Sequence, residues 1–172
     1  FRVINAFIPI FWTRELGTSP EQGSFALTVF FSIGIFMTYI GGLLGDKYGP
    51  IKIIRLSLLI WLPAMFLLTE VPTFSPVIMM PVAYLLLLMI GAAKAISYSP
   101  VIVLGQTYLA KSIGFASGIT LGVSQTIGGI IAPVVGNLAD TYTLPAAMMT
   151  LVPFLVMGLG ASLILKDPKK LN

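Results

Sequence analysis

The sequence predicts an all-α membrane protein with six transmembrane helices, and three observations support this fold class. Hydrophobic residues make up 57% of the 172 residues and charged residues only 9%, with a mean hydropathy of +0.99. A soluble domain needs about a quarter of its residues charged to cover its surface. The charged residues also lie mostly in short links between long apolar runs. Such an alternation is typical of a protein that crosses the lipid bilayer several times.

The composition excludes several other classes of function. The chain has no cysteine and no histidine, which excludes disulfides, thiolate chemistry and the usual metal clusters. It has no nucleophile–base pair and no phosphate-binding loop, so we expect neither an enzyme nor an ATP-driven pump, and no cofactor. The net charge of +4 is spread over the links. It indicates membrane topology and gives no reason to expect nucleic acid as a partner.

The first apolar run is too short to cross a bilayer. Residues 1–12 would extend about 18 Å as a helix, against a hydrocarbon core of about 30 Å. The chain does not begin with methionine, and no signal peptide follows its first residue. We therefore interpret residues 1–12 as the end of a truncated helix, and the chain as a fragment of a longer protein.

The other five predicted helices are longer, and turn-forming or charged residues set their limits. Gly-Thr-Ser-Pro precedes the second, Gly-Pro separates the second from the third, and Glu-Val-Pro ends the third. A polar link at 105–111, an Asp-Thr-Tyr segment at 140–142 and a lysine-rich end limit the rest. These helices are expected at residues 24–45, 51–69, 76–104, 112–139 and 144–165.

Positive charges gather on alternate links. One set of links holds seven cations against two acidic residues, Asp46 and Asp167: Lys47, Lys52, Arg55, Lys111, Lys166, Lys169 and Lys170. The other set holds one cation, Arg14, against four acidic residues: Glu15, Glu21, Glu70 and Asp140. The positive-inside rule places the first set, and with it the C-terminus, in the cytoplasm.

The link between the second and third helices reads Gly-Leu-Leu-Gly-Asp-Lys-Tyr-Gly at residues 42–49. Its glycines allow neighbouring helices to approach closely, and Gly-Pro at its end predicts a sharp turn. One interpretation is a positive cytoplasmic loop that only sets topology. The alternative is a gating loop, in which the Asp46 carboxylate pairs with a nearby cation. The candidate gating residues are Gly42, Asp46, Lys47, Gly49, Lys52 and Arg55.

The order Gly-x-x-x-Asp-Lys-x-Gly resembles the loop motif of the major facilitator superfamily, found between the second and third helices of each half. The sequence departs from that motif at Pro50, where the family usually has a cation, and Lys52 follows two places later. The pattern Gly-x-x-x-Asp-x-Tyr returns at residues 136–142, at an offset of 94. Three helices separate the two copies, so they would lie on opposite membrane faces. This predicts an inverted repeat of three helices plus three, as in each half of a major facilitator transporter.

A second resemblance covers residues 103–140. Val-Leu-Gly-Gln-Thr-Tyr-Leu, then Gly-Phe-Ala-Ser-Gly, and a glycine-rich helix ending in Leu-Ala-Asp are similar to the fosmidomycin-resistance-type branch of this superfamily. The sequence departs from this pattern at Thr107, where members often have an acidic residue. The resemblance implies that residues 1–172 form the C-terminal six-helix half of a proton-coupled efflux transporter. It further implies an inner-membrane location and an N-terminal six-helix half as partner.

Two cations are expected near the bilayer midplane. Arg2 lies about 16 Å from the outer end of its helix, and Lys94 lies a similar distance from the cytoplasmic end of its own. A charge at the centre of a helix costs about 2.5–3.5 kcal/mol, so such residues usually face a cavity or a partner. All the carboxylates of the chain lie in the links. The missing half or a small anionic substrate must then supply the counter-charge, unless Lys94 reaches toward the cytoplasm.

Other polar and aromatic residues near this depth have alternative interpretations. Tyr98 follows Lys94 by four residues and can join a substrate site, whereas packing is expected for Tyr84. Gln125 lies within the glycine-rich fifth helix, where it either makes an interhelical hydrogen bond or contacts substrate. Trp12 is expected to anchor the membrane interface, and Trp61 to pack in the interior.

The residues thus support three hypotheses. The first is proton-coupled efflux of a small anionic compound, with Arg2, Lys94, Tyr98 and Gln125 as candidate binding residues. The second is uptake or exchange of an organic anion, which the two midplane cations suit equally well. The third is a non-transporting membrane scaffold that uses its glycine-rich faces for assembly. Loss or retention of function on neutralising Lys94 would separate transport from the scaffold.

Overall fold

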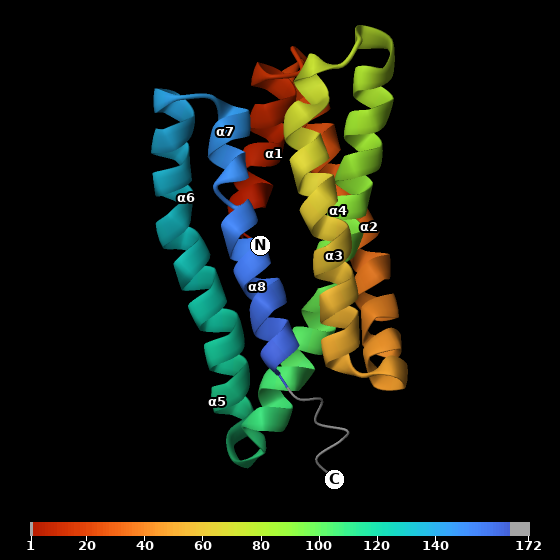
Figure 1. Cartoon of the computed structure of the whole chain (residues 1–172), viewed down its shortest axis with the longest axis vertical. Helices are drawn as coiled ribbons and strands as arrows, with labels where there is room; N and C mark the ends of the chain where they lie inside the picture. The colour runs from red at the N-terminus through yellow and green to blue at the C-terminus, as the bar shows by residue number, and fades with distance from the viewer. Residues whose placement is uncertain (1, 166–172) are drawn as a thin grey trace.

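The structure is a computed structural model that describes the backbone of residues 2–165 and the side chains of residues 3–165. Long helices run side by side along one axis (Figure 1). The α-helices are α1 (Arg2–Arg14), α2 (Pro20–Tyr48), α3 (Pro50–Glu70), α4 (Pro76–Tyr108), α5 (Ile113–Gly118), α6 (Ser124–Thr141), α7 (Leu144–Met149) and α8 (Val152–Ile164). Two 3-10 turns, η1 (Val71–Thr73) and η2 (Ala110–Ser112), and one π turn, η3 (Ile119–Val123), connect them.

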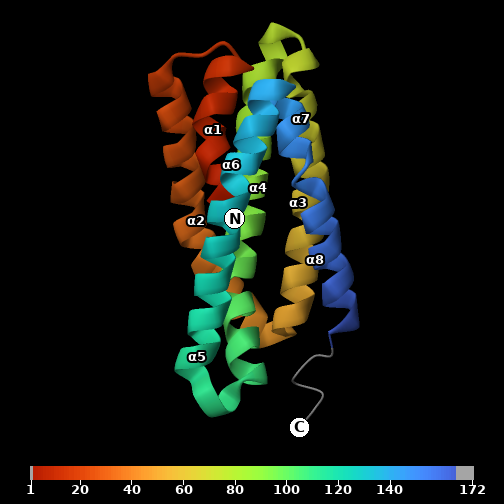
Figure 2. The ribbon, with the colours of Figure 1, turned by 90° about the vertical axis from the view of Figure 1, so that its left-hand side faces the viewer.

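Five helical stretches of the described chain are long and apolar enough to cross a membrane: Pro20–Tyr48, Pro50–Thr73, Pro76–Tyr108, Ala110–Thr141 and Leu144–Ile164. The helix α1, with 13 residues, is the shorter sixth segment, and it begins midway along the long axis of the bundle (Figure 1). The α2–α3 and α6–α7 connections, which carry the two copies of the repeated motif, lie at opposite ends of the bundle (Figure 2). The all-α membrane fold class predicted from the sequence is confirmed.

Local sequence signals explain where α2 begins and ends. Ser19 and Gln22 form a capping box, in which the Gln22 N–H donates to Ser19 Oγ and the Ser19 N–H donates to Gln22 Oε1, each at 3.4 Å. At the other end, the N–H of Gly49 donates to the Gly45 carbonyl at 2.9 Å, and Gly49 adopts a φ of 94°. Residues with a side chain rarely adopt this conformation. Pro50 then starts α3, so the predicted Gly-Pro turn is confirmed.

The sequence predicts one continuous fifth helix, but the structure interrupts it, because the π turn η3 separates α5 from α6. A π turn holds more residues per turn than an α turn, so residues on either side do not keep one four-residue register. The sixth predicted helix is also interrupted, between α7 and α8. Pro153 lies in the first turn of α8. In a continuous α-helix its ring would clash with the carbonyl of Met149, four residues earlier, so the helix breaks between the two.

The interior of the bundle is built from apolar side chains of α1, α2, α3, α4, α6 and α7. Trp12 is fully buried, with its ring centroid 5.5 Å from that of Tyr84 on α4. The prediction that Trp12 anchors the membrane interface was wrong, because α1 turns this face toward α4. Trp61 is buried in the interior as expected, and Tyr84 packs between Trp12 and Phe25.

The helices α2 and α4 approach closely along a row of glycines. A Cβ at Gly45 would lie 3.1 Å from Pro100 Cγ, and one at Gly42 would lie 3.4 Å from Ser99 Oγ. At Gly41 an added Cβ would overlap the backbone of Ile96. Small residues permit such contact between membrane helices, because no side chain holds the two backbones apart. The expectation that glycines before the motif loop allow close approach is confirmed.

Candidate functional site

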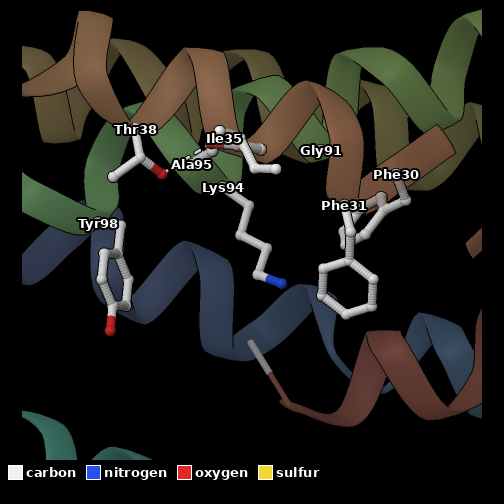
Figure 3. Close-up of a pocket in the computed structure, with 9 residues that line it drawn as sticks. Phe30, Phe31, Ile35, Thr38, Gly91, Lys94, Ala95 and Tyr98 are labelled. Carbon is white, nitrogen blue, oxygen red and sulfur yellow. Dashed lines mark hydrogen bonds between the residues drawn. The ribbon is translucent and has the colours of Figure 1, made fainter. Parts of the chain in front are cut away.

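A cavity of about 270 Å³ lies between α2 and α4, near the middle of both helices (Figure 3). It is lined by Phe30, Phe31, Gly34, Ile35 and Thr38 from α2, and by Gly91, Lys94, Ala95 and Tyr98 from α4. Among these lining residues only Lys94 carries a charge. The Thr38 hydroxyl donates to the Gly34 carbonyl of its own helix at 2.8 Å. The cavity therefore combines one cation with mostly apolar walls.

Neutral groups from two helices, α1 and α2, surround the Lys94 ammonium. Its Nζ donates to Asn5 Oδ1 of α1 at 2.9 Å. The same Nζ lies 4.7 Å from the ring centroid of Phe30 and 5.5 Å from that of Phe31, both on α2. Aromatic faces attract cations through their quadrupole, although less strongly than a carboxylate does. Within residues 3–165, Lys94 forms no ion pair. The site thus holds a positive charge whose negative counterpart is not among the described side chains.

Tyr98 lies in the same cavity as Lys94, one helical turn further along α4, with 40% of its surface exposed. Figure 3 shows the Lys94 side chain reaching between Phe31 on one side and Tyr98 on the other. The hydroxyl of Tyr98 is the second polar group available to a bound molecule. The structure therefore brings together two of the four residues expected to bind substrate.

The other two expected binding residues are not placed in this cavity. Gln125 lies in the first turn of α6 with an exposed side chain, and it makes no hydrogen bond to residues 3–165. Both alternatives for Gln125, an interhelical hydrogen bond and contact with substrate, stay predictions, because α6 turns this side chain away from the neighbouring described helices. Arg2 is the first residue of α1, and its side chain lies outside the described residues. Asn5 follows it by one turn on the same face.

Sequence reasoning missed three residues of the site. Asn5 is a polar residue in an apolar segment, three positions after Arg2, and this was a usable signal. Phe30 and Phe31 gave no such signal, because aromatic residues are ordinary in an apolar helix. Only the crossing of α2 and α4, which Gly91 permits by leaving Phe30 room, brings both rings to the lysine.

The candidate gating residues lie at the end of the bundle where α2 meets α3. Asp46, Lys47 and Lys52 are exposed, and Lys47 Nζ lies 5.1 Å from the ring centroid of Tyr48. Arg55 points instead to α8, where its Nε and Nη2 donate to the Ser162 carbonyl at 3.0 and 2.5 Å. Of the three cations expected near Asp46, Arg55 therefore contacts the backbone of α8.

The opposite end of the bundle has an ion pair between α1 and α6. Arg14 Nη1 lies 3.3 Å from Asp140 Oδ1, with both side chains largely exposed. Asp140 is the counterpart of Asp46 in the repeated motif. Within the described residues, no group of acidic side chains, cysteine or histidine is placed to hold a metal ion.

The described helices are long and apolar enough to cross a membrane, and one of them carries a cation that faces a cavity. The chain belongs to the Major Facilitator Superfamily, whose family model matches residues 1–172. It is 32% identical over 166 residues to the uncharacterized MFS-type transporter YfnC of Bacillus subtilis (strain 168), covering 96% of the chain and 39% of that protein.

A second relative is the fosmidomycin resistance protein of Escherichia coli (strain K12). It is 28% identical over 137 residues, which cover 80% of the chain and 32% of that protein. The chain thus spans only about two fifths or less of the length of either relative. No solved structure matches the chain significantly. The membership predicted from the loop motif and the fosmidomycin-resistance-type segment is confirmed at the level of the superfamily.

Proposed function

We propose that this chain is the C-terminal half of a secondary active transporter that exports a small anionic compound in exchange for protons. The observation that carries the proposal is Lys94, a cation in the middle of a membrane-spanning helix that faces a cavity and has a neutral hydrogen-bond partner. Keeping a charge at this depth costs free energy, which a structural role in an apolar bundle does not repay. An anionic substrate supplies the missing counter-charge.

The walls of the cavity restrict the kind of anion. Lys94 is the one charged lining side chain, and the Phe30 and Phe31 rings, Ile35 and Ala95 offer apolar surface. A molecule with one anionic group and an apolar body matches this lining. A second anionic group would be desolvated against apolar side chains without a described partner, and that is costly.

Efflux is the favoured direction because one relative is named a fosmidomycin resistance protein. Proton exchange follows from the resemblance to that branch. Uptake or exchange of an organic anion is the alternative, since a cation in a cavity serves either direction. A non-transporting scaffold is disfavoured, because assembly through glycine-rich faces gives no reason to retain Lys94.

The partner of this half is proposed to be an N-terminal six-helix half of the same transporter. The 18-residue apolar windows of Pro20–Tyr48 and Ala110–Thr141 have 11% and 6% of their residues buried, against 44% for Pro50–Thr73. A Cβ at Gly114, Gly118 or Gly122 would meet no atom within 4 Å. Glycines permit close contact between membrane helices, and these three have no such contact in the described chain. They therefore suit contact with the proposed N-terminal half.

The proposed setting is the inner membrane of the cell, crossed several times and with the C-terminus in the cytoplasm. The balance of cations places the α2–α3 connection, Lys111 and the lysines after residue 165 on the cytoplasmic side. An accessibility test of single cysteines introduced at Tyr48 and Thr143 distinguishes the two orientations, since the natural chain has no cysteine.

The function is tested with the purified full-length protein in liposomes that carry a pH gradient. We expect the gradient to drive movement of a monoanion with an apolar body, and its collapse by a protonophore to stop net transport. If the transport rate does not depend on the pH gradient, transport is not coupled to protons and that part of the proposal is wrong. Absence of any anion transport by a folded protein would favour the scaffold.

The gating hypothesis for Asp46 predicts a kinetic defect. Asp46 lies in the last turn of α2, where the helix dipole disfavours an anion unless cations offset it. Asp46→Asn should slow transport up to about fivefold, the effect of losing an exposed ion pair of about 0.2–1 kcal/mol. Protein level and substrate affinity should remain. The initial transport rate and the substrate affinity are measured on wild type and variant. Glu70→Gln, at the opposite end of the bundle, is the control. An unfolded variant, or a normal rate, would leave the loop as a topology signal only.

A further inference from the structure

A second cavity, of about 310 Å³, lies among α1, α3, α6 and the α7–α8 segment, and shares no lining residue with the Lys94 cavity. Its walls are apolar, with Trp61 and Met65 from α3 and Phe154 and Leu155 from α8. The one hydroxyl in its lining, that of Ser124, donates to the Leu121 carbonyl at 2.9 Å. With no charged lining side chain, this space suits hydrocarbon.

Two of the helices that line this cavity, α3 and α8, hold a cation between them at one end. Ser162 lies in the last turn of α8, so its carbonyl is one of those without a partner inside the helix. Arg55 of α3 donates Nε and Nη2 to that oxygen, and thereby caps α8. A carbonyl is neutral, so the guanidinium keeps its charge, and it retains further N–H donors. Lys52 lies one turn before Arg55 on the same face, with an exposed side chain.

The spacing between the cations and the apolar cavity matches the depth of one leaflet. Trp61 and Met65 follow Arg55 by six and ten residues on α3, which is about 9–15 Å along the helix. Half of a hydrocarbon core is about 15 Å. Between the two levels, a Cβ added at Gly158 of α8 would lie 3.8 Å from Leu58 Cδ1 of α3, and one added at Gly160 would have no neighbour within 4 Å. The line of contact between α3 and α8, the α3–α8 seam, is therefore open on its outer side.

We propose that the α3–α8 seam binds an anionic phospholipid, whose phosphate contacts Arg55 and Lys52 and whose acyl chain enters the apolar cavity. Basic sites at the end of neighbouring membrane helices attract anionic headgroups. The lipid ties α8 to α3 at the level where α8 ends. This site is independent of the Lys94 cavity and of the transported compound.

The proposal is tested with the purified full-length protein in detergent, by thermal unfolding and by native mass spectrometry. Long-chain phosphatidylglycerol should raise the Tm by several degrees, whereas long-chain phosphatidylcholine, short-chain phosphatidylglycerol and inorganic phosphate should not. The double variant Lys52→Gln/Arg55→Gln should bind phosphatidylglycerol about 25-fold more weakly, or about fivefold for each cation. Glutamine keeps an amide donor for the Ser162 carbonyl. Lys111→Gln, at an exposed lysine of η2, should leave the affinity unchanged.

Each arm of the experiment has an outcome that overturns the assignment. Equal stabilisation by phosphatidylcholine would show that the lipid charge is not recognised. A response to inorganic phosphate or to the short-chain lipid would show an anion site without an acyl groove. Unchanged affinity in the double variant would place the lipid elsewhere. If the double variant does not fold, Lys52→Gln alone carries the test, with an expected loss of about fivefold.

Discussion

Lys94→Ala is expected to abolish anion binding and transport while the protein still folds. Losing a charge-assisted hydrogen bond costs about 1.5–3 kcal/mol, which weakens substrate affinity by about tenfold to a hundredfold. The same change removes a half-buried cation and its desolvation cost, so thermal stability should be equal or higher. The measurement is the substrate-induced shift in Tm of the purified full-length protein, made on wild type and variant side by side.

Two further variants separate the charge from its surroundings. Lys94→Arg keeps the charge but changes the shape of the donor, so it should retain part of the binding. Lys111→Ala removes an exposed lysine of η2, outside the cavity, and should bind like wild type. An undiminished shift in Lys94→Ala would overturn the assignment. Lys94 would then be a structural cation that pairs with the proposed N-terminal half.

Gly41→Ala is expected to be strongly destabilising, although alanine normally favours a helix over glycine by about 0.5–1 kcal/mol. The added Cβ would lie 2.7 Å from Ile96 Cα and 2.8 Å from its carbonyl carbon. These are backbone atoms of α4, so no side-chain rotation can relieve the overlap. Forced repacking typically costs about 1–3 kcal/mol. We expect a lower Tm and a lost or weakened anion response, since the Lys94 cavity lies between the same two helices.

Gly34→Ala is the matched control on the same helix. Its added Cβ would lie 3.9 Å from Ala95 Cβ, an ordinary van der Waals contact, so the helix preference of alanine should dominate. We expect unchanged or slightly higher stability. Thermal unfolding of both variants decides the matter. Equal stability of the two would mean that the close α2–α4 approach contributes nothing measurable.

The sequence by itself determined the fold class and the superfamily. Apolar length and sparse charge force helices across a bilayer, because an unpaired backbone group in hydrocarbon costs several kcal/mol. A local signal was equally reliable at Gly49, since a positive φ depends on neighbours in the chain. The cap at Ser19 is also local, but the prediction missed it and began this helix at residue 24 instead of Pro20. The depth of Lys94 also followed from the sequence, because rise per residue converts position into depth.

The tertiary structure alone decided which side chains meet. Asn5, Phe30 and Lys94 lie far apart in the chain, and only the crossing of α1, α2 and α4 brings them together. The same reason explains the error at Trp12, since helical periodicity gives a residue's face but not what that face meets. The capping of α8 by Arg55 joins residues 107 positions apart. Helix packing fixes such contacts, and the linear pattern of an apolar membrane sequence does not encode them locally.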